Sequence, residues 1–368
     1  MTNRALYEAI MHYGSFDRMP VVHWKAWTET YQRWHREGYP RTPEYNQWDC
    51  PKEHEFFGTQ PHWDTIWYEA GLFPAFPGTT LQETEDFRIF RDGAGVVQKS
   101  WKGQSGIPHH VDYTLKTAAD WPAFKERLQP DPGRISGQIE ATLISLRDRN
   151  LPVVFWTGSM MGWIRDWMGV ENMCYLMYDS PEVYGDMVDT LSRLVCWAAD
   201  QILPLARKVN CPVIQGFGWE DICGKSGPLV SPDLFDAHVA PGYRRIRCKL
   251  EEYGINIYGV DSDGLVEPLI QHWLDAGVNL MFPIEPGTWG ATPEAMRQKF
   301  GKELLIVGGF DKLALEKSRE AIDAEIEAHM ELMKEGGFMM MPDHFITPGT
   351  PLANYQYYLD RMRRLRLR

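Results

Sequence analysis

The feature that most constrains the fold is an alternation, from about residue 150 onward, between short apolar runs and longer stretches with helical periodicity. Continuous apolar runs of this length are typical of strands in a parallel sheet that is covered on both faces. The runs are Leu151–Thr157, Cys211–Gly216, Ile255–Val260, Asn279–Ile284, Leu304–Gly308 and Phe338–Met341. The helical stretches between them are Ser180–Lys208, Pro232–Tyr253 after the capping residue Ser231, Glu267–Ala276 and Ser318–Glu335. This order predicts a parallel α/β fold.

Two earlier segments, Val21–Trp24 and Trp63–Tyr68, bring the number of predicted strands to eight. Eight βα units close into a TIM barrel, so we expect one (β/α)8 domain over residues 1–368. An open doubly wound sheet is the alternative, but the chain has neither a GxGxxG nor a GxxxxGK[ST] segment after a strand.

The region from about residue 25 to 150 differs from the rest of the chain. It is rich in Trp, Pro, Gly and charged residues and has weak periodicity. Phe87–Phe90 and Val96–Lys99 resemble the two arms of a hairpin around Asp92-Gly93. We therefore expect an irregular insertion or cap at the N-terminal side of the barrel.

Composition excludes several classes of function. The net charge is −12, which argues against nucleic acid as a partner. No apolar run reaches the roughly 18 residues that a membrane span requires, and the first residues do not resemble a signal peptide. The six cysteines form no CxxC pair, so we expect a cytoplasmic protein with free thiols. The 15 Trp and 17 Met indicate either a bulky core or a roomy pocket for a flat ligand.

Acidic residues follow the predicted strands at the end where a barrel carries its active site. Positions i and i+2 of an extended segment point the same way, so Asp261 and Asp263 should face the barrel mouth together. Neighbouring carboxylates repel one another, and a divalent cation such as zinc, manganese or iron would relieve the repulsion. The residues at this rim are Glu220, Asp221, Asp261, Asp263, Glu285, Asp311, Asp343 and His344.

Structural roles compete with this interpretation. Asp261 and Asp311 can each cap the helix that follows, because Asp is a favoured N-cap residue. His344 can be a core histidine bonded to Asp343. For the set Asp261, Asp263 and His344, a metal site is the preferred interpretation.

Several segments together resemble the uroporphyrinogen decarboxylase superfamily, which also contains corrinoid-dependent methyltransferases. They are Asp17-Arg18-Met19-Pro20, Gly227-Pro228-Leu229-Val230-Ser231-Pro232, Gly308-Gly309-Phe310-Asp311 and Pro348-Gly349-Thr350-Pro351 with Asn354-Tyr355. The resemblance implies a (β/α)8 barrel. The decarboxylases hold the substrate carboxylates with the arginines of an Arg-Gln-Ala-Gly-Arg-Tyr segment. Lys25–Tyr31 stands there in this chain and lacks both arginines, so the chain resembles the methyltransferase branch and not a true decarboxylase.

The zinc methyltransferases of the superfamily carry His-x-Cys-Gly after one strand and a further Cys before Pro-x-Thr-Pro. Aligned on Gly264 and on Pro348–Pro351, these ligands become Asp261, Asp263 and His344 in this chain. Oxygen ligands make a metal a harder Lewis acid than thiolates do, which suits activation of an ether or alcohol oxygen.

We therefore expect a methyltransferase that removes a methyl group from a methoxylated, aromatic substrate and passes it to a corrinoid. Glu220 or Asp221 would act as general acid, with Glu285 as a further catalytic carboxylate. Trp24, Trp156, Trp219 and Trp289 would bind the substrate. No Asp-x-His-x-x-Gly segment is present, so a corrinoid protein would be the partner that supplies cobalamin. The resemblance also implies a homodimer.

Two other functions remain open at the level of sequence. A decarboxylase or lyase acting on a small acid would need a cation at the barrel mouth, supplied by Arg18, Lys25 or Lys225. A non-catalytic protein that binds a flat cofactor would use the tryptophans without chemistry.

Overall fold

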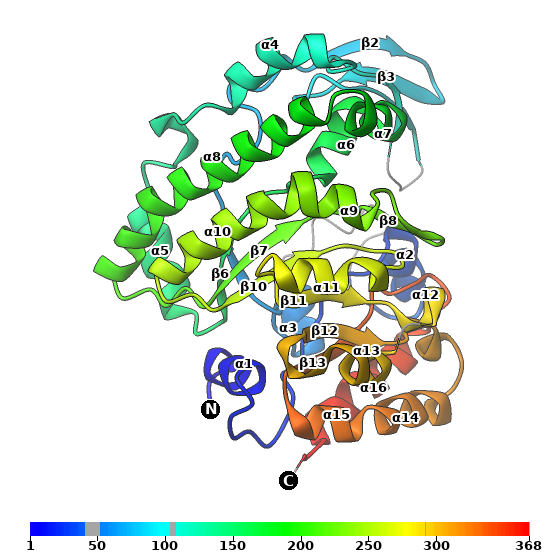
Figure 1. Cartoon of the computed structure of the whole chain (residues 1–368). Coiled ribbons are helices and arrows are strands. Elements are labelled where there is room, and N and C mark those ends of the chain that lie inside the picture. The colour runs from blue at the N-terminus through cyan, green and yellow to red at the C-terminus, as the bar shows by residue number, and fades with distance from the viewer. Residues whose placement is uncertain (41–51, 104–107, 291, 368) are drawn as a thin grey trace.

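Seven parallel strands form the central sheet of the protein, which we describe from a computed structural model (Figure 1). The structure describes residues 1–40, 52–103, 108–290 and 292–367, apart from the side chains of Thr288 and Trp289. In spatial order the strands are β1 (Asp64–Ile66), β6 (Val153–Trp156), β7 (Gln215–Trp219), β10 (Ile257–Asp261), β11 (Leu280–Ile284), β12 (Leu305–Phe310) and β13 (Phe338–Pro342). All six neighbouring pairs are parallel.

An extended segment lies between the two outer strands, where an eighth strand was expected. Val22 forms a parallel bridge with Gln60, just before β1, and Ala26 forms one with Ile346, just after β13. These isolated bridges join the two edges of the curled sheet without a regular strand. The expected strand at Val21–Trp24 is thus an irregular connection, because α2 (Thr28–Arg36) begins soon after it.

The predicted strand at Cys211–Gly216 is displaced toward the C-terminus in the structure. The Cys211 nitrogen still bonds the Ala206 carbonyl of the preceding helix, and Pro212 has no N–H to give to a neighbouring strand. Ladder bonding begins with Ile214, whose nitrogen donates to the Val153 carbonyl. The strand therefore ends at Trp219, which brings Glu220 and Asp221 directly to the rim.

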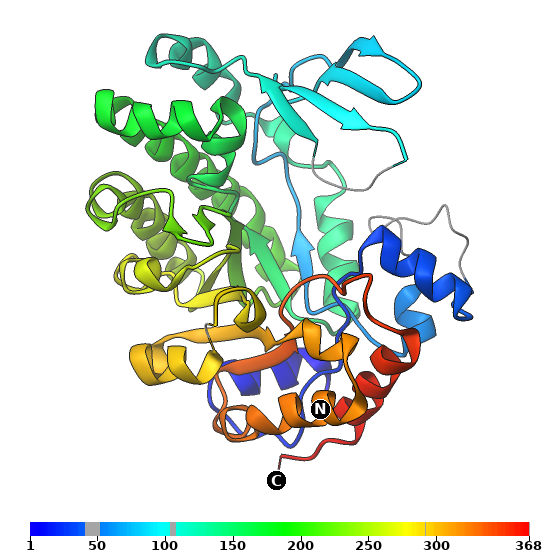
Figure 2. The ribbon, with the colours of Figure 1, turned by 90° about the vertical axis from the view of Figure 1, so that its right-hand side faces the viewer.

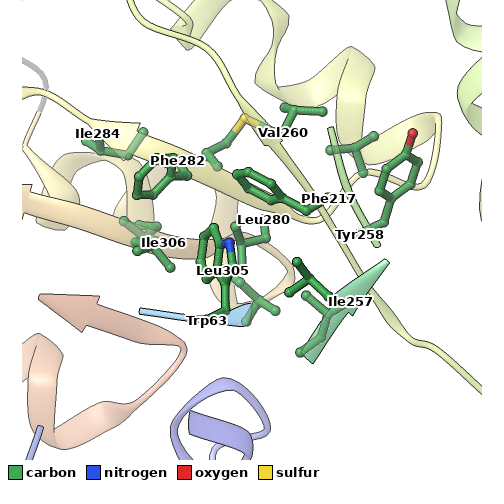
Figure 3. Close-up of a cluster of buried hydrophobic side chains, with 14 of the residues drawn as sticks. Trp63, Phe217, Ile257, Tyr258, Val260, Leu280, Phe282, Ile284, Leu305 and Ile306 are labelled. Atoms are coloured by element: carbon green, nitrogen blue, oxygen red, sulfur yellow. The ribbon is translucent and has the colours of Figure 1, made fainter. Parts of the chain in front are cut away.

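Helices cover the outside of the sheet, and one continuous core fills the space between the layers and the inside of the curl. Figure 3 shows the inner part, where Trp63 and Phe217 pack with Phe282. The helices are α1 (Asn3–Met11), α2, α3 (Glu53–Phe57), α4 (Trp121–Lys125), α5 (Ile139–Asp148), α6 (Gly162–Met168), α7 (Val170–Asp179), α8 (Pro181–Lys208), α9 (Pro232–Leu234), α10 (Ala240–Glu252), α11 (Glu267–Asp275), α12 (Pro286–Trp289), α13 (Pro293–Phe300), α14 (Arg319–Ala328), α15 (Met330–Glu335) and α16 (Leu352–Arg364).

The N-terminal region is more regular than the irregular insertion with one hairpin that the sequence predicts. Four antiparallel strands, in the order β2 (Thr79–Glu83), β3 (Phe87–Arg91), β4 (Val97–Trp101) and β5 (His109–Asp112), form a second sheet (Figure 2). The predicted hairpin is its centre, and Asp92 closes the turn by accepting bonds from the nitrogens of Ala94 and Val96. Weak alternation hid the outer strands, because every residue of β2 is exposed.

A two-stranded hairpin of β8 (Cys223–Gly224) and β9 (Gly227–Pro228) follows β7. The five described cysteines are free. Within the described residues, no helix combines the length and apolar character needed to cross a membrane.

Candidate functional site

A cavity of about 650 Å³ opens at the carboxyl ends of the central strands. Its wall is mainly aromatic: among the described residues, six tryptophans and no methionine line it. The described lining residues are Trp24, Trp27, His62, Trp63, Thr65, Trp67, Pro108, Trp156, Phe217, Trp219, Asp221, Asp261, Asp263, Phe282, His344 and Phe345. Both interpretations of the Trp content hold in part, because other tryptophans, such as Trp34 and Trp273, are buried in the core. The described methionines are mostly buried in the core as well.

Three carboxylates meet in this cavity because of the sheet register. Asp261 ends β10 and pairs with Trp219 of β7, so the residues after the two strands are brought side by side. The Asp263 nitrogen donates to Asp221 Oδ1 at 3.0 Å. One ligand oxygen from each of Asp221, Asp261 and Asp263 lies within 4.8 Å of the others. The structure therefore groups Asp261 and Asp263 as expected, with Asp221 as the third member.

Repulsion and burial make this cluster electrostatically costly. Burial first, and then the charges of Asp221, Asp263 and Glu285, raise the pKa of Asp261 well above its usual range. Burial and Asp263 raise the pKa of Asp221 to about 6, although Arg165 and the Asp263 backbone oppose the shift. Asp263 Oδ1 is buried and has no hydrogen-bond partner among the described residues. A bound cation would stabilise all three carboxylates.

Backbone geometry at two positions holds the cluster together. Asp221 adopts a left-handed conformation with φ 49°, which is uncommon for a residue with a side chain and is frequent at functional sites. Gly264 has φ 97°, and a Cβ there would lie 2.1 Å from the Cys223 carbonyl oxygen. Only glycine lets the loop after β10 approach the β8 segment so closely.

His344 lies beside the three carboxylates. Its Nε2 is 3.3 Å from Asp263 Oδ2, and its ring stacks on Trp27 with centroids 5.9 Å apart. Burial lowers the pKa of His344, but the hydrogen bond and charge of Asp263 outweigh burial, so the pKa is raised overall. The alternative pairing with Asp343 does not occur, since the Asp343 Oδ1 atom bonds Lys312 Nζ at 3.1 Å.

Glu285 lies close to the cluster but does not line the cavity. Lys312 Nζ is 3.4 Å from Glu285 Oε1 and also contacts Asp343, so these three side chains form a buried charged group. Burial and the charge of Asp263 raise the pKa of Glu285 to about 7, and Lys312 opposes this shift. Its predicted catalytic role stays a prediction.

The Glu220 side chain also lies outside the cavity wall. Its carboxylate accepts bonds from Ser159 Oγ at 3.0 Å, from the backbone nitrogens of residues 160–162 at 2.8–2.9 Å and from the Tyr243 hydroxyl. The side chain thus stabilises the turn between β6 and α6, because it accepts hydrogen bonds from N–H groups that have no partner within the helix. Burial raises its pKa, and the backbone bonds oppose that rise. These contacts assign Glu220 a structural position, unlike its neighbour Asp221.

The two remaining alternatives for single residues come out differently. Asp261 does not cap a helix, because it ends β10 and α11 begins only at Glu267. Asp311 does cap a short helical turn, since its side chain accepts a bond from the Leu313 nitrogen.

Three of the four expected tryptophans, Trp24, Trp156 and Trp219, line the cavity. The Trp289 side chain lies outside the described part of the structure. The sequence analysis did not single out Trp63, Thr65 and Trp67, which lie in or next to β1 and line the cavity. They are two residues apart, and this strand periodicity would have placed their side chains on one face of the predicted strand. It also missed His62, for which the sequence offers no signal.

The cations that a lyase would need are elsewhere. Arg18 bonds Asp17 and the Met1 carbonyl, and Lys25 pairs with Glu53 at 3.0 Å. Lys225 lies in the exposed turn between β8 and β9. Within the described part of the chain, no Lys or Arg lines the cavity.

The chain was compared with known families, curated proteins and solved structures. No curated protein matches the sequence. Among solved structures, a methyltransferase from Methanosarcina mazei has the same fold, with a TM-score of 0.61 and 14% identity over 99% of this chain and 98% of its own. A B12-independent methionine synthase from a Shewanella species gives a TM-score of only 0.38 at 13% identity, over 64% of this chain and 67% of its own. The sequence model of the family "Uroporphyrinogen decarboxylase (URO-D)" matches residues 101–365, and the protein therefore belongs to the uroporphyrinogen decarboxylase family.

Proposed function

We propose that this protein is a methyltransferase that removes the methyl group of a methoxylated aromatic compound and passes it to a corrinoid. The observation that carries the proposal is the meeting of three carboxylates and one imidazole at an otherwise aromatic cavity. Membership of the family and the shared fold with a protein described as a methyltransferase support it.

The donor set fits a divalent metal ion. Asp221, Asp261 and Asp263 offer three oxygens within 4.8 Å of one another, and His344 is bonded to one of them. The buried Asp263 Oδ1 atom has no hydrogen-bond partner within the described residues and could therefore coordinate a metal ion. Oxygen and imidazole donors without a thiolate suit zinc, manganese or iron.

A metal held by these residues would act as a Lewis acid toward the ether oxygen of the substrate. The aromatic walls would place the ring so that its methoxy group faces the carboxylates. Cob(I)alamin would supply the electron pair for the new bond to the methyl carbon, while the electron pair of the broken carbon–oxygen bond would stay on oxygen, which would then take up a proton. The His344 imidazole lines the cavity next to Asp263 and can donate a hydrogen bond to that oxygen. A substrate that fills the cavity would also keep bulk water away from the leaving oxygen.

Residues 1–368 contain no segment of the Asp-x-His-x-x-Gly type, and a separate corrinoid protein is the proposed partner. The homodimer stays a prediction. The lyase alternative is not favoured, since none of its candidate cations reaches the cavity.

The first test is elemental analysis of protein purified without chelator or affinity metal. We expect about one transition metal ion per chain in the wild type and none in the Asp263→Ala/His344→Ala double variant. Asp311→Asn is the matched control, because Asp311 lies at the same rim but caps a helical turn and does not line the cavity. Metal content should be unchanged in this control.

The second test is methyl transfer from methoxylated benzenes to cob(I)alamin, followed by the absorbance of the cobalt centre. Transfer that depends on Asp263 and His344 supports the proposal. A wild type that stays metal-free after reconstitution, or methyl transfer that survives in the double variant, contradicts it. Tight corrinoid binding without turnover would favour the cofactor-binding alternative.

A further inference from the structure

His62 is a half-buried residue in the aromatic part of the cavity wall. Its ring stacks on Phe282 with centroids 5.6 Å apart, and its centroid is 4.1 Å from that of Trp63. Its Nδ1 atom is buried and has no hydrogen-bond partner among the described residues. Leaving a buried polar atom without a partner costs about 1–3 kcal/mol, so such atoms are uncommon unless something else binds them.

The His62 ring is uncharged at neutral pH. Burial, together with the nearby His54 and Lys25, lowers its pKa to about 3. A neutral imidazole offers one N–H donor and one nitrogen acceptor. It can therefore pair with a hydroxyl group, which both donates and accepts.

His62 and His344 share a neighbour in the cavity wall. The Trp24 ring packs against both imidazoles, with its centroid 6.1 Å from that of His62 and 5.4 Å from that of His344. Both histidines line the same cavity, so an aromatic ligand bound there can contact both.

The charge of the cavity defines the chemistry of the ligand. Three Asp side chains line it, and within the described residues no Lys or Arg does. A ligand carboxylate beside His62 would find no Lys or Arg among the described residues to pair with, and protonation of His62 itself is disfavoured by burial. An uncharged substituent avoids both costs.

We propose that His62 selects aromatic ligands that carry, besides the group that faces Asp263, an uncharged hydrogen-bonding substituent, such as a phenolic hydroxyl, which pairs with its imidazole. This inference rests on the proposed function only for the orientation of the methoxy group. It adds that the substrate class is methoxyphenols, and neither plain methoxybenzenes nor methoxybenzoates. Sites built to pair with a hydroxyl reject analogues that lack it, because their own polar group is then left unpaired.

The test is calorimetric titration of the full-length protein, as purified, with methoxyphenol, methoxybenzene and methoxybenzoate. We expect the wild type to bind methoxyphenol at least about 10-fold more tightly than either of the others, which is the ratio given by about 1.4 kcal/mol. His62→Phe keeps the ring that packs on Phe282 and removes the polar nitrogen. In this variant methoxyphenol and methoxybenzene should bind with equal affinity. Circular dichroism and a melting curve show that the variant is folded.

His62→Gln is the second variant, because its amide can restore a hydrogen bond and with it part of the preference. An unchanged preference for methoxyphenol in His62→Phe overturns the inference, as does a wild type that binds all three ligands equally or none of them. Binding needs no methyl acceptor. Selective binding that depends on His62, without methyl transfer, therefore refutes the proposed function and leaves the inference standing, whereas transfer from methoxybenzene at the same rate refutes the inference alone.

Discussion

Replacing Glu220 by Gln tests the conclusion that this carboxylate stabilises the fold and does not take part in the chemistry. One carboxylate oxygen accepts three bonds, from Ser159 Oγ and from the nitrogens of residues 161 and 162. The other accepts bonds from the Met160 nitrogen and the Tyr243 hydroxyl. The glutamine oxygen can replace only one of the two, so its NH2 group must face the remaining donors.

The magnitude follows from these contacts. If the amide oxygen takes the site with three donors, the Tyr243 hydroxyl can rotate to accept a bond, but the Met160 N–H cannot. An unpaired buried N–H costs about 1–3 kcal/mol. The other bonds weaken when the acceptor loses its charge, but the pKa of Glu220 is raised, so burial of the charge outweighs these bonds and the neutral amide recovers that loss. We expect a net loss of about 1–3 kcal/mol.

The assay is equilibrium denaturation in urea at pH 7, where the midpoint should fall while the slope stays the same. Tyr243→Phe removes one of the donors and should cost about 1 kcal/mol. The stability losses of the two single variants should not add up in the double variant, since both substitutions change the hydrogen bond between residues 220 and 243. A Glu220→Gln protein that is as stable as the wild type but has lost ligand binding or methyl transfer would refute the structural assignment.

Two further predictions concern stability and pH. Asp221→Asn should stabilise the metal-free protein by about 2 kcal/mol at pH 7, because the pKa of Asp221 is raised to about 6, and urea titrations from pH 4 to 7 should show the gap widen with pH. Added metal should stabilise the wild type more than this variant. Burial lowers the pKa of His329, but the hydrogen bonds that its ring donates to Glu294 and Glu325 raise it overall to about 9. The stabilisation of the folded protein by protonated His329 is complete below pH 6.5 and is lost as the pH rises through 9. Because Glu294 is 43% exposed, we expect only about 1–2 kcal/mol, absent from the melting profile of His329→Gln.

The sequence by itself determined the strand and helix order of the C-terminal two thirds. Apolar runs such as Leu280–Ile284 and the glycines after helices are local signals, and they reflect burial of both faces of a parallel sheet. The rule that active sites form at the carboxyl ends of strands then placed Asp261, Asp263 and His344 together. Register explains this success, because residues just after neighbouring parallel strands lie side by side.

Tertiary structure decided what each side chain does there. The sequence gives Glu220 and Asp221 the same predicted role as general acid. In the structure the Glu220 carboxylate bonds the backbone at the start of α6, about 60 residues earlier in the chain, whereas Asp221 lines the cavity. Likewise, only the fold places the His62 ring among Trp63, Phe282 and Trp24, with one ring nitrogen that has no partner among the described residues. These distinctions depend on contacts between distant segments, and no local pattern encodes which donor or charge will lie opposite a given side chain.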